Sequence, residues 1–248
     1  PQQLFYNRDE NMNNEWLTAF VLHRRPYRET SYIVDFFTLQ EGKISAVAKG
    51  VKNSKSDRKS LLQPFQPLNV QLAGKSELKN LRSVESAAAY LPLTKKPLFC
   101  AMYINEVTNR IMPPGLASEP LYQAYTEALQ RLNEEDAEGN IETTLRQFER
   151  ALLEEMGLMP DFTYDVEWEA PIQPEYLYRL QAEHGFCRQV EGQGGSRAFP
   201  GQALIDLAEH VYTPLSKKVA KVLFRELLKT LLGDKPLKSR ELFLRQPK

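Results

Sequence analysis

The chain has very few residues of the kinds that bind metals or form covalent cross-links. Its 248 residues include two cysteines, Cys100 and Cys187, which stand far apart, and three scattered histidines, His23, His184 and His210. Two distant cysteines support neither a disulfide framework nor a four-ligand zinc site. The histidines have no carboxylate or cysteine at ligand spacing, and no His-Glu-x-x-His motif occurs. We therefore predict idle or buried thiols, no metal site and no cofactor.

Long apolar runs are also missing. No stretch approaches the roughly 18 to 20 apolar residues that a membrane helix needs, so we expect no membrane partner. Residues 1–15 are polar and lack the apolar centre of a signal peptide, which predicts a cytoplasmic protein with a disordered extension over residues 1–14. Acidic residues are numerous, but abundance alone does not identify catalytic carboxylates, and we predict that the protein is not an enzyme.

The formal net charge is zero, yet the charges are segregated along the chain. Residues 1–90 hold 13 Lys/Arg and nine Asp/Glu, a balance of +4, and within residues 43–82 the balance rises to +7. Residues 91–212 have a balance of −11, and residues 213–248 of +7. A local positive field attracts polyanions even on a neutral molecule. The two basic blocks therefore favour a polyanionic partner.

The first third of the chain has the pattern of a small β-barrel. Five runs contain β-branched and aromatic residues in partial alternation with polar ones, and Gly, Pro, Ser and Asn separate them; the runs are 16–22, 31–38, 43–48, 68–72 and 77–85. We expect Pro26 to end the first strand. Five strands with a long connection after the third are typical of an oligonucleotide-binding (OB) barrel. The sequence predicts an OB domain over residues 15–90.

The rest of the chain, residues 91–248, is predicted to be a mainly helical domain with a small β-hairpin. Apolar residues follow a helical period at Cys100, Ile104, Val107 and Ile111, at Tyr122, Tyr125, Leu129 and Leu132, at Leu145, Phe148, Leu152 and Met156, and at Ala220, Phe224, Leu227 and Leu231. Thr213 and Pro214 suit the start of the last helix. Residues 176–180 and 185–190 can pair as the hairpin. The fold class is therefore α+β.

Several short stretches of the chain carry a family likeness, and they run in order over residues 19–31, 47–50, 62–67, 81–83, 103–106, 145–149 with Gly157, and 235–243. Together they resemble the RecO family of bacterial recombination mediator proteins. The resemblance implies an OB domain followed by a helical domain, and a role without catalytic turnover. Many members carry a four-cysteine zinc site in a segment corresponding to about residues 160–200. Only Cys187 falls there, so this chain is similar to a zinc-free branch.

The resemblance also implies a set of partners. RecO-like proteins bind single- and double-stranded DNA and anneal complementary strands. They engage the acidic, Phe-ended tail of single-stranded-DNA-binding protein, and with RecR they help to load RecA onto coated strands. A nucleoid-associated protein in the cytoplasm is the localisation that this role implies.

Cationic side chains on the barrel, its loops and the last helices are the candidate DNA-binding residues, because they neutralise phosphates without reading sequence. They are Arg24, Arg25, Tyr27, Arg28, Lys43, Lys49, Lys52, Lys55, Arg58, Lys59, Lys75, Lys79, Arg82, Lys218, Lys221, Arg225, Lys238 and Arg240, with Tyr27 included for base stacking. The stripe on the last helix has an alternative interpretation as a solvated helix face.

For the tail of single-stranded-DNA-binding protein, the resemblance points to the helix that carries Arg146, Phe148 and Leu152. A terminal Phe needs an apolar slot, and its carboxylate needs a cation at the rim. The alternative for Arg146 is an intrahelical contact one turn away, with Glu142 or Arg150.

Two other functions remain open from the sequence. The barrel can bind structured RNA instead of DNA, because both nucleic acids present backbone phosphates. The chain can also be an adaptor that mainly docks proteins through its acidic helical region.

Overall fold

The structure is a computed structural model, and it describes residues 15–52, 57–134, 137–190 and 197–244. The predicted extension over residues 1–14 and the candidate Lys55 lie outside these residues. The chain forms two compact units. The first consists of the residues up to Ile141 together with those from Lys235 onward, and the second is Glu142–Asp234. The predicted domain boundary near residue 90 stays a prediction.

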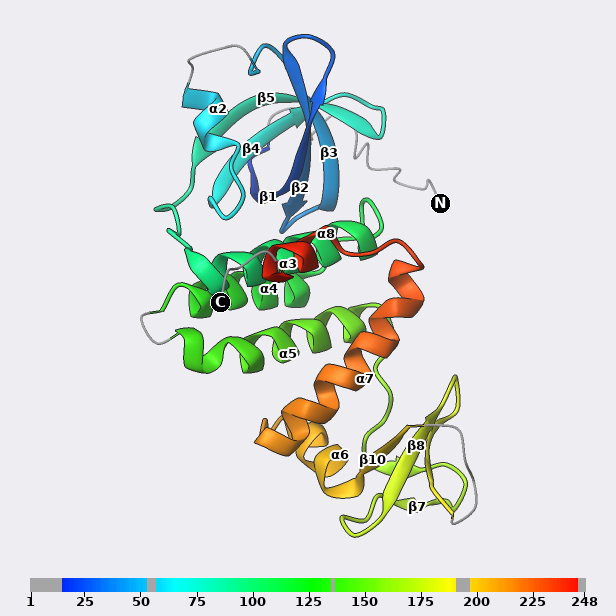
Figure 1. The fold of residues 1–248 in the computed structure, drawn as a ribbon. Coiled ribbons are helices and arrows are strands. Elements are labelled where there is room, and N and C mark those ends of the chain that lie inside the picture. The colour runs from blue at the N-terminus through cyan, green and yellow to red at the C-terminus, as the bar shows by residue number, and fades with distance from the viewer. Residues whose placement is uncertain (1–14, 53–56, 135–136, 191–196, 245–248) are drawn as a thin grey trace, which may run out of the picture. The chain divides into compact units, whose positions relative to one another are not determined.

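The N-terminal part is a closed barrel of five strands, in the order β1-β2-β3-β5-β4 (Figure 1). The strands are β1 (Leu17–Tyr27), β2 (Ser31–Thr38), β3 (Gly42–Ala48), β4 (Leu68–Ala73) and β5 (Leu78–Ser86). The β3–β5 pair is parallel and the others are antiparallel. The helix α2 (Asp57–Leu61) lies in the long connection after β3. The predicted OB-fold barrel is confirmed.

Alternating residues fill the inside of this barrel. Val21 on β1, Val34 and Phe36 on β2, Ala46 on β3 and Val70 on β4 are fully buried in one apolar cluster. Burying such a side chain contributes roughly 1.5–3 kcal/mol relative to leaving it exposed. The period of two in the sequence therefore corresponds to the inner face of the barrel.

The first strand is longer than the sequence predicts. Pro26 was expected to end the strand, but it pairs with Tyr32 of β2 inside the ladder. On its other side β1 pairs with β4 only over Leu17–Ala19. At Pro26 there is therefore no second neighbouring strand that would need a backbone N–H donor, and a proline is tolerated at such an edge.

The first unit also contains three helices, α3 (Lys95–Ile111), α4 (Glu119–Leu132) and α8 (Lys238–Leu244). In α4 the side chain of the N-cap Ser118 accepts a hydrogen bond from the Leu121 backbone N–H. The helical pattern predicted for α3 and α4 is confirmed. The helix α8 was not predicted, because it is too short to show a period.

The second unit combines helices with a small sheet. The helices are α5 (Ala137–Glu155), which begins just before the unit, α6 (Gly201–Ala208) and α7 (Pro214–Leu232). The sheet has the order β10-β8-β9-β6-β7, with β6 (Tyr164–Asp165), β7 (Ala170–Pro171), β8 (Leu177–Gln181), β9 (Gly185–Arg188) and β10 (Ala198–Pro200). The predicted hairpin is the β8–β9 pair. The three shorter strands were not predicted, because two or three residues show no alternation.

Candidate nucleic-acid interface

Aromatic residues on the outer face of β1 and β2 pack against α4. Phe20 and Phe37 each contact both Tyr122 and Tyr125, with ring centroids 5.1–5.9 Å apart. Burial raises the pKa of both tyrosines above the ordinary value. Tilted and edge-on aromatic pairs of this kind add stability beyond their buried area. This part of the barrel wall is therefore covered by protein and is not a surface for bases.

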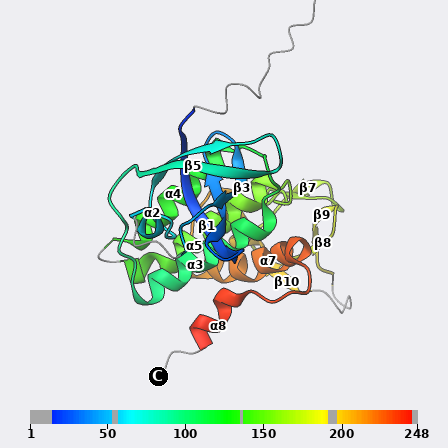
Figure 2. The ribbon, with the colours of Figure 1, turned by 90° about the horizontal axis from the view of Figure 1, so that it is seen from above.

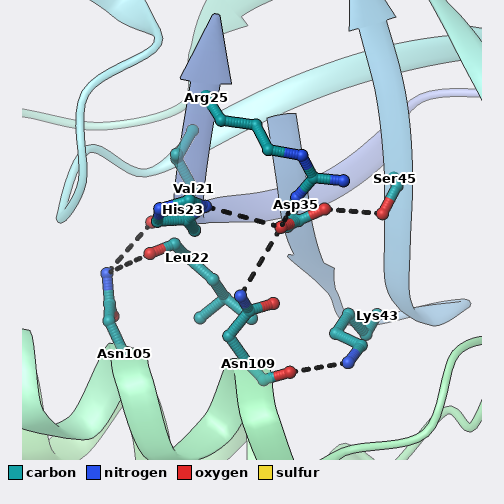
Figure 3. A network of polar contacts seen from close by, with 9 residues as sticks. All are labelled: Val21, Leu22, His23, Arg25, Asp35, Lys43, Ser45, Asn105 and Asn109. Carbon is teal, nitrogen blue, oxygen red and sulfur yellow. Dashed lines mark hydrogen bonds and ion pairs between the residues drawn. The ribbon is translucent and has the colours of Figure 1, made fainter. Parts of the chain in front are cut away.

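A polar network continues this contact along α3, as Figure 3 shows. The buried Asp35 of β2 accepts hydrogen bonds from Ser45 Oγ at 2.6 Å, Arg25 Nη1 at 3.3 Å and Asn109 Nδ2 at 3.5 Å. His23 Nδ1 lies 3.7 Å from the same carboxylate. A buried carboxylate needs such partners. The candidate Arg25 is thus one of the side chains that hold Asp35.

Asn105 of α3 fastens the helix to an irregular point of the barrel. Its side-chain amide donates to the carbonyls of Val21 and Leu22, at 3.1 and 3.3 Å, where the β1–β2 register shifts. Its carbonyl accepts a hydrogen bond from the Tyr125 hydroxyl. A bulge leaves strand groups without ladder partners, and Asn105 supplies them. Asn105 was not predicted as a functional or anchoring residue; its polarity among the buried positions of α3 was the available clue.

The candidate Lys43 belongs to the same contact. Its Nζ donates to the Asn109 carbonyl at 2.7 Å, and burial lowers the pKa of this amine, opposed in part by the negative charge of Asp35. Lys43 is therefore half-buried and anchors β3 to α3.

The barrel is hollowed where the β1–β2 turn meets β3 and β5. The hollow has a volume of about 610 Å³ and is lined by Tyr27, Arg28, Glu29, Thr30, Ser31, Val47, Lys49, Leu78, Lys79 and Asn80. Three of these are predicted cationic residues and one is the predicted stacking residue. The hollow thus brings together cations from three separate elements beside an aromatic ring.

The turn at this hollow has an unusual backbone. Arg28 has a φ of 53°, in the left-handed region that few non-glycine residues adopt. Its guanidinium carbon lies 5.1 Å from the centre of the Tyr27 ring, a cation–π distance. The charge and the ring are therefore presented together at the rim.

Other candidate cations on the barrel bind backbone carbonyls of the barrel itself. Arg24 Nη1 donates to the carbonyls of Lys59 and Leu62, and its guanidinium lies 5.4 Å from the Tyr32 ring centre. The remaining such contacts are Arg58 to Arg82 O, Lys59 to Lys52 O and Lys79 to Gly74 O. Arg24 is half-buried and joins the end of α2 to the barrel.

The aromatic residues of the barrel differ in their exposure. Phe36 and Phe65 are buried and cannot stack on a base. Tyr27 is half-buried at the hollow. Lys75, in the β4–β5 hairpin, is exposed and lies outside the residues that line the hollow.

The cationic stripe on α7 is exposed along its length. Lys218, Lys221, Arg225 and Lys229 are all open to solvent. The opposite side of the helix, with Leu223 and Phe224, is buried. The second unit therefore has a cationic helix face of its own.

The C-terminal candidates lie on α8, which α3 holds in place. The carboxylate of Glu106 accepts hydrogen bonds from the backbone N–H groups of Lys238 and Ser239, at 2.9 and 2.8 Å. Although burial opposes it, these bonds and the nearby Arg110 lower the pKa of Glu106. The side chains of Lys238 and Arg240 are exposed.

The residues predicted to bind the tail of single-stranded-DNA-binding protein are buried. Arg146 is 6% exposed and forms an ion pair at 2.8 Å with Glu149, itself 3% exposed. Phe148 and Leu152 are buried. Arg146 does form an intrahelical pair, but with Glu149 rather than with the residues that were considered. The tail site stays a prediction.

The small sheet does not fit a cysteine zinc site. Cys187 is buried, and burial raises the pKa of its thiol, against the thiolate that a metal needs. In the described ranges no group of three or more His, Cys, Asp or Glu side chains is placed to hold a metal ion. The carboxylate of Asp165 instead accepts backbone hydrogen bonds from Glu167, Trp168 and Arg188.

No helix in the part of the chain that the structure describes is long and apolar enough to cross a membrane.

Comparisons with known proteins cover nearly the whole chain. Residues 12–90 match the family described as Recombination protein O N terminal, and residues 96–241 match Recombination protein O C terminal. The DNA repair protein RecO of Alteromonas mediterranea is 65% identical over 96% of this chain and 100% of its own length. The proteins of the same name from Pseudoalteromonas atlantica and Vibrio parahaemolyticus are 44% and 40% identical, over 94% and 93% of this chain and 95% and 93% of their own lengths. Both family regions and these relatives show that the chain belongs to the RecO family of DNA repair and recombination proteins.

Proposed function

We propose that the protein is a non-enzymatic DNA repair mediator that binds single- and double-stranded DNA and anneals complementary strands. The observation that supports this most is the hollow on the barrel, which is lined by Tyr27 together with Arg28, Lys49 and Lys79. Cations neutralise phosphates whatever the sequence, and an aromatic face stacks on any base. Binding of this kind depends on salt and leaves base edges free to pair.

Annealing needs two strands to approach each other against their own repulsion. The hollow on the barrel and the stripe on α7 are two cationic surfaces on separate units. Bound cations screen the phosphates of each strand. Holding one strand on each surface is the arrangement that we propose for the annealing step.

The test is the salt dependence of binding to a labelled single-stranded oligonucleotide, measured by anisotropy. Arg28→Asn removes the charge and keeps a residue that tolerates a positive φ, and Lys49→Gln removes the second charge. Each is expected to reduce the slope of log K against log salt by about 0.7, the value for one phosphate contact on a single strand. Lys96→Gln, an exposed cation on α3, is the matched control. Equal slopes for all four proteins would refute the hollow as the DNA site.

The same preparations separate this function from its alternatives. A preference for a matched RNA oligonucleotide in competition with DNA would favour an RNA-binding factor. A protein adaptor would leave the annealing rate of naked complementary strands unchanged, whereas a mediator is expected to increase it.

We further propose that the acidic, Phe-ended tail of single-stranded-DNA-binding protein binds beside Arg146, Phe148 and Leu152. The support is the chemistry of one arginine next to two apolar side chains. Since Glu149 already occupies the arginine, the tail carboxylate must replace that partner.

Because Glu149 and the tail carboxylate compete for Arg146, substitutions of the two residues are expected to change the affinity for the tail in opposite directions. Glu149→Gln weakens the internal ion pair, so it is expected to tighten binding of a tail peptide, whereas Arg146→Met is expected to weaken it. Calorimetric titration with the peptide measures both. Unchanged affinity in Glu149→Gln, with the fold intact by circular dichroism, would assign Arg146 a structural role.

RecR is the proposed partner for loading RecA, which is engaged indirectly. The test is annealing of strands coated with single-stranded-DNA-binding protein, with and without its acidic tail. Loss of the tail is expected to slow annealing of coated strands and to leave naked strands unaffected.

A further inference from the structure

The small sheet of the second unit carries a large share of the exposed apolar side chains. Of the thirteen large apolar residues exposed in the described part of the chain, six lie in one short stretch: Tyr164, Val166, Trp168, Tyr176, Leu177 and Val190. Trp168 is 57% and Leu177 50% exposed. Single exposed apolar residues are common, but a concentration of them marks an interaction surface.

Two of the six residues, Tyr176 and Trp168, contact the same arginine. The guanidinium carbon of Arg188 lies 3.5 Å from the centre of the Tyr176 ring and 4.9 Å from that of Trp168. We call these three residues the aromatic clamp. Two rings fixed by one cation lose little freedom when they bind a partner, so more of the contact energy remains as affinity.

The backbone beneath the aromatic clamp is fixed as well. Asp165, 1% exposed, accepts hydrogen bonds from the N–H groups of Glu167 and Trp168 at 3.0 and 3.1 Å, and from that of Arg188 at 3.1 Å. One carboxylate thereby joins β6, the following turn and β9. The surface is consequently preformed.

The exposed charges that neighbour the aromatic clamp in the sequence are acidic. Five carboxylates in this region are exposed, those of Asp161, Glu167, Glu169, Glu175 and Glu183. The two arginines of the sheet are engaged within it: Arg179 lies 3.9 Å from Glu167, and Arg188 stands between the rings. A phosphate chain would meet like charge here, whereas a cationic partner is complementary.

The edges of the sheet do not suit strand addition. The outer strands are β7 and β10, of two and three residues, and they end at Pro171 and Pro200. Short edges with proline cannot extend a hydrogen-bonded ladder. A partner therefore contacts side chains on the face of the sheet.

We propose that this face docks a lysine- or arginine-rich protein segment that also carries apolar side chains. The apolar side chains pack on Trp168 and Tyr176, and the cations pair with the carboxylates that lie next to them in the sequence, Glu169 and Glu175 among them. This role goes beyond DNA binding and uses residues of the second unit that take no part in it.

The experiment uses the full chain with Trp16→Phe, which leaves Trp168 as the only tryptophan because the sequence has two. The probe is a peptide of alternating lysine and leucine, titrated while Trp168 emission is recorded. A saturable change in emission is expected. A matched peptide of alternating glutamate and leucine is expected to produce none.

Variants locate the site. Tyr176→Ala and the pair Glu169→Gln with Glu175→Gln are each expected to weaken the lysine–leucine peptide about tenfold, in the range of an interface anchor. Leu215→Ala, an exposed apolar residue of α7 in the same unit, is the control and is expected to change nothing. Equal binding of the glutamate peptide, saturation of the Trp168 signal by a single-stranded oligonucleotide, or equal weakening by Leu215→Ala would overturn the proposal.

The outcome is independent of the proposed DNA site. Lys49→Gln and Arg28→Asn are expected to keep the affinity for the lysine–leucine peptide. Loss of peptide binding in these barrel variants would also overturn the assignment to the small sheet.

Discussion

The barrel and the small sheet present the same pair of groups in opposite surroundings. At the barrel, Arg28 lies over Tyr27 beside Lys49 and Lys79. At the small sheet, Arg188 contacts Tyr176 and Trp168, and exposed carboxylates neighbour these residues in the sequence. An arginine over an aromatic ring therefore does not define a ligand. The neighbouring charges decide between a polyanion and a cationic partner.

The largest expected effect on this comparison is the loss of stability when the Asp165 carboxylate beneath the aromatic clamp is removed. Asp165→Ala leaves three backbone N–H groups of the small sheet without their acceptor. We expect a loss of about 3–5 kcal/mol in the free energy of unfolding of the second unit, because hydrogen bonds to charged groups are strong and buried donors are costly to leave unpaired. Urea unfolding followed by Trp168 emission in the Trp16→Phe protein measures it.

The control for that change is Asp161→Ala, which removes an exposed carboxylate that accepts only from Thr163. It is expected to cost less than about 1 kcal/mol, since both partners are solvent-exposed. Similar losses for the two variants would contradict the structural role of Asp165.

The substitution in the first unit that corresponds to Asp165→Ala is Asn105→Leu. Two strand carbonyls and the Tyr125 hydroxyl lose their partner, and we expect a loss of about 3 kcal/mol in the stability of the first unit. Urea unfolding followed by Trp16 emission in a Trp168→Phe protein is the measurement. Met102→Leu, at an exposed position of the same helix, should be neutral.

A smaller loss of stability is expected when the cation of the aromatic clamp is removed. Arg188→Leu removes the cation between the rings and is expected to cost about 1–2 kcal/mol and to change Trp168 emission. Arg197→Leu breaks an exposed pair with Glu226 and should cost at most about 0.5 kcal/mol. If Arg188→Leu left the emission unchanged, the two rings would not depend on this arginine.

The smallest effect is a pH dependence at α8. The pKa of Glu106 is lowered from 4.5 in the folded protein, so its contribution is fully present above pH 4.5 and is lost as the pH falls through the lower folded value. We expect faster hydrogen exchange at the Lys238 and Ser239 amides below that pH, with a stability change of about 1 kcal/mol. In Glu106→Gln this acid-dependent step should disappear, and its persistence would point to another group.

Much of the fold could be predicted because its signals are local. Alternation in residues 31–38 and 43–48 corresponds to β2 and β3, and the helical period of Cys100, Ile104 and Val107 corresponds to the buried side of α3. The strand end at Pro26 was wrong, because whether a proline ends a strand depends on which neighbours the strand has.

The candidate site was less predictable. Counting positive residues cannot distinguish Lys49, which lines the hollow, from Lys43, which holds α3. The alternatives for Arg146 included an intrahelical contact, yet the partner turned out to be Glu149. Such choices depend on geometry that the order of residues does not express.

By itself, the sequence determined the five-stranded barrel pattern, the main helices, the segregation of charge and the family. Each of these follows from the type and spacing of nearby residues. Only the tertiary structure decided which cations remain available, which aromatic rings are buried, and that Trp168, Tyr176 and Arg188 meet. The physical reason is that a side chain's charge and exposure act through the groups around it, and those groups come from distant parts of the chain.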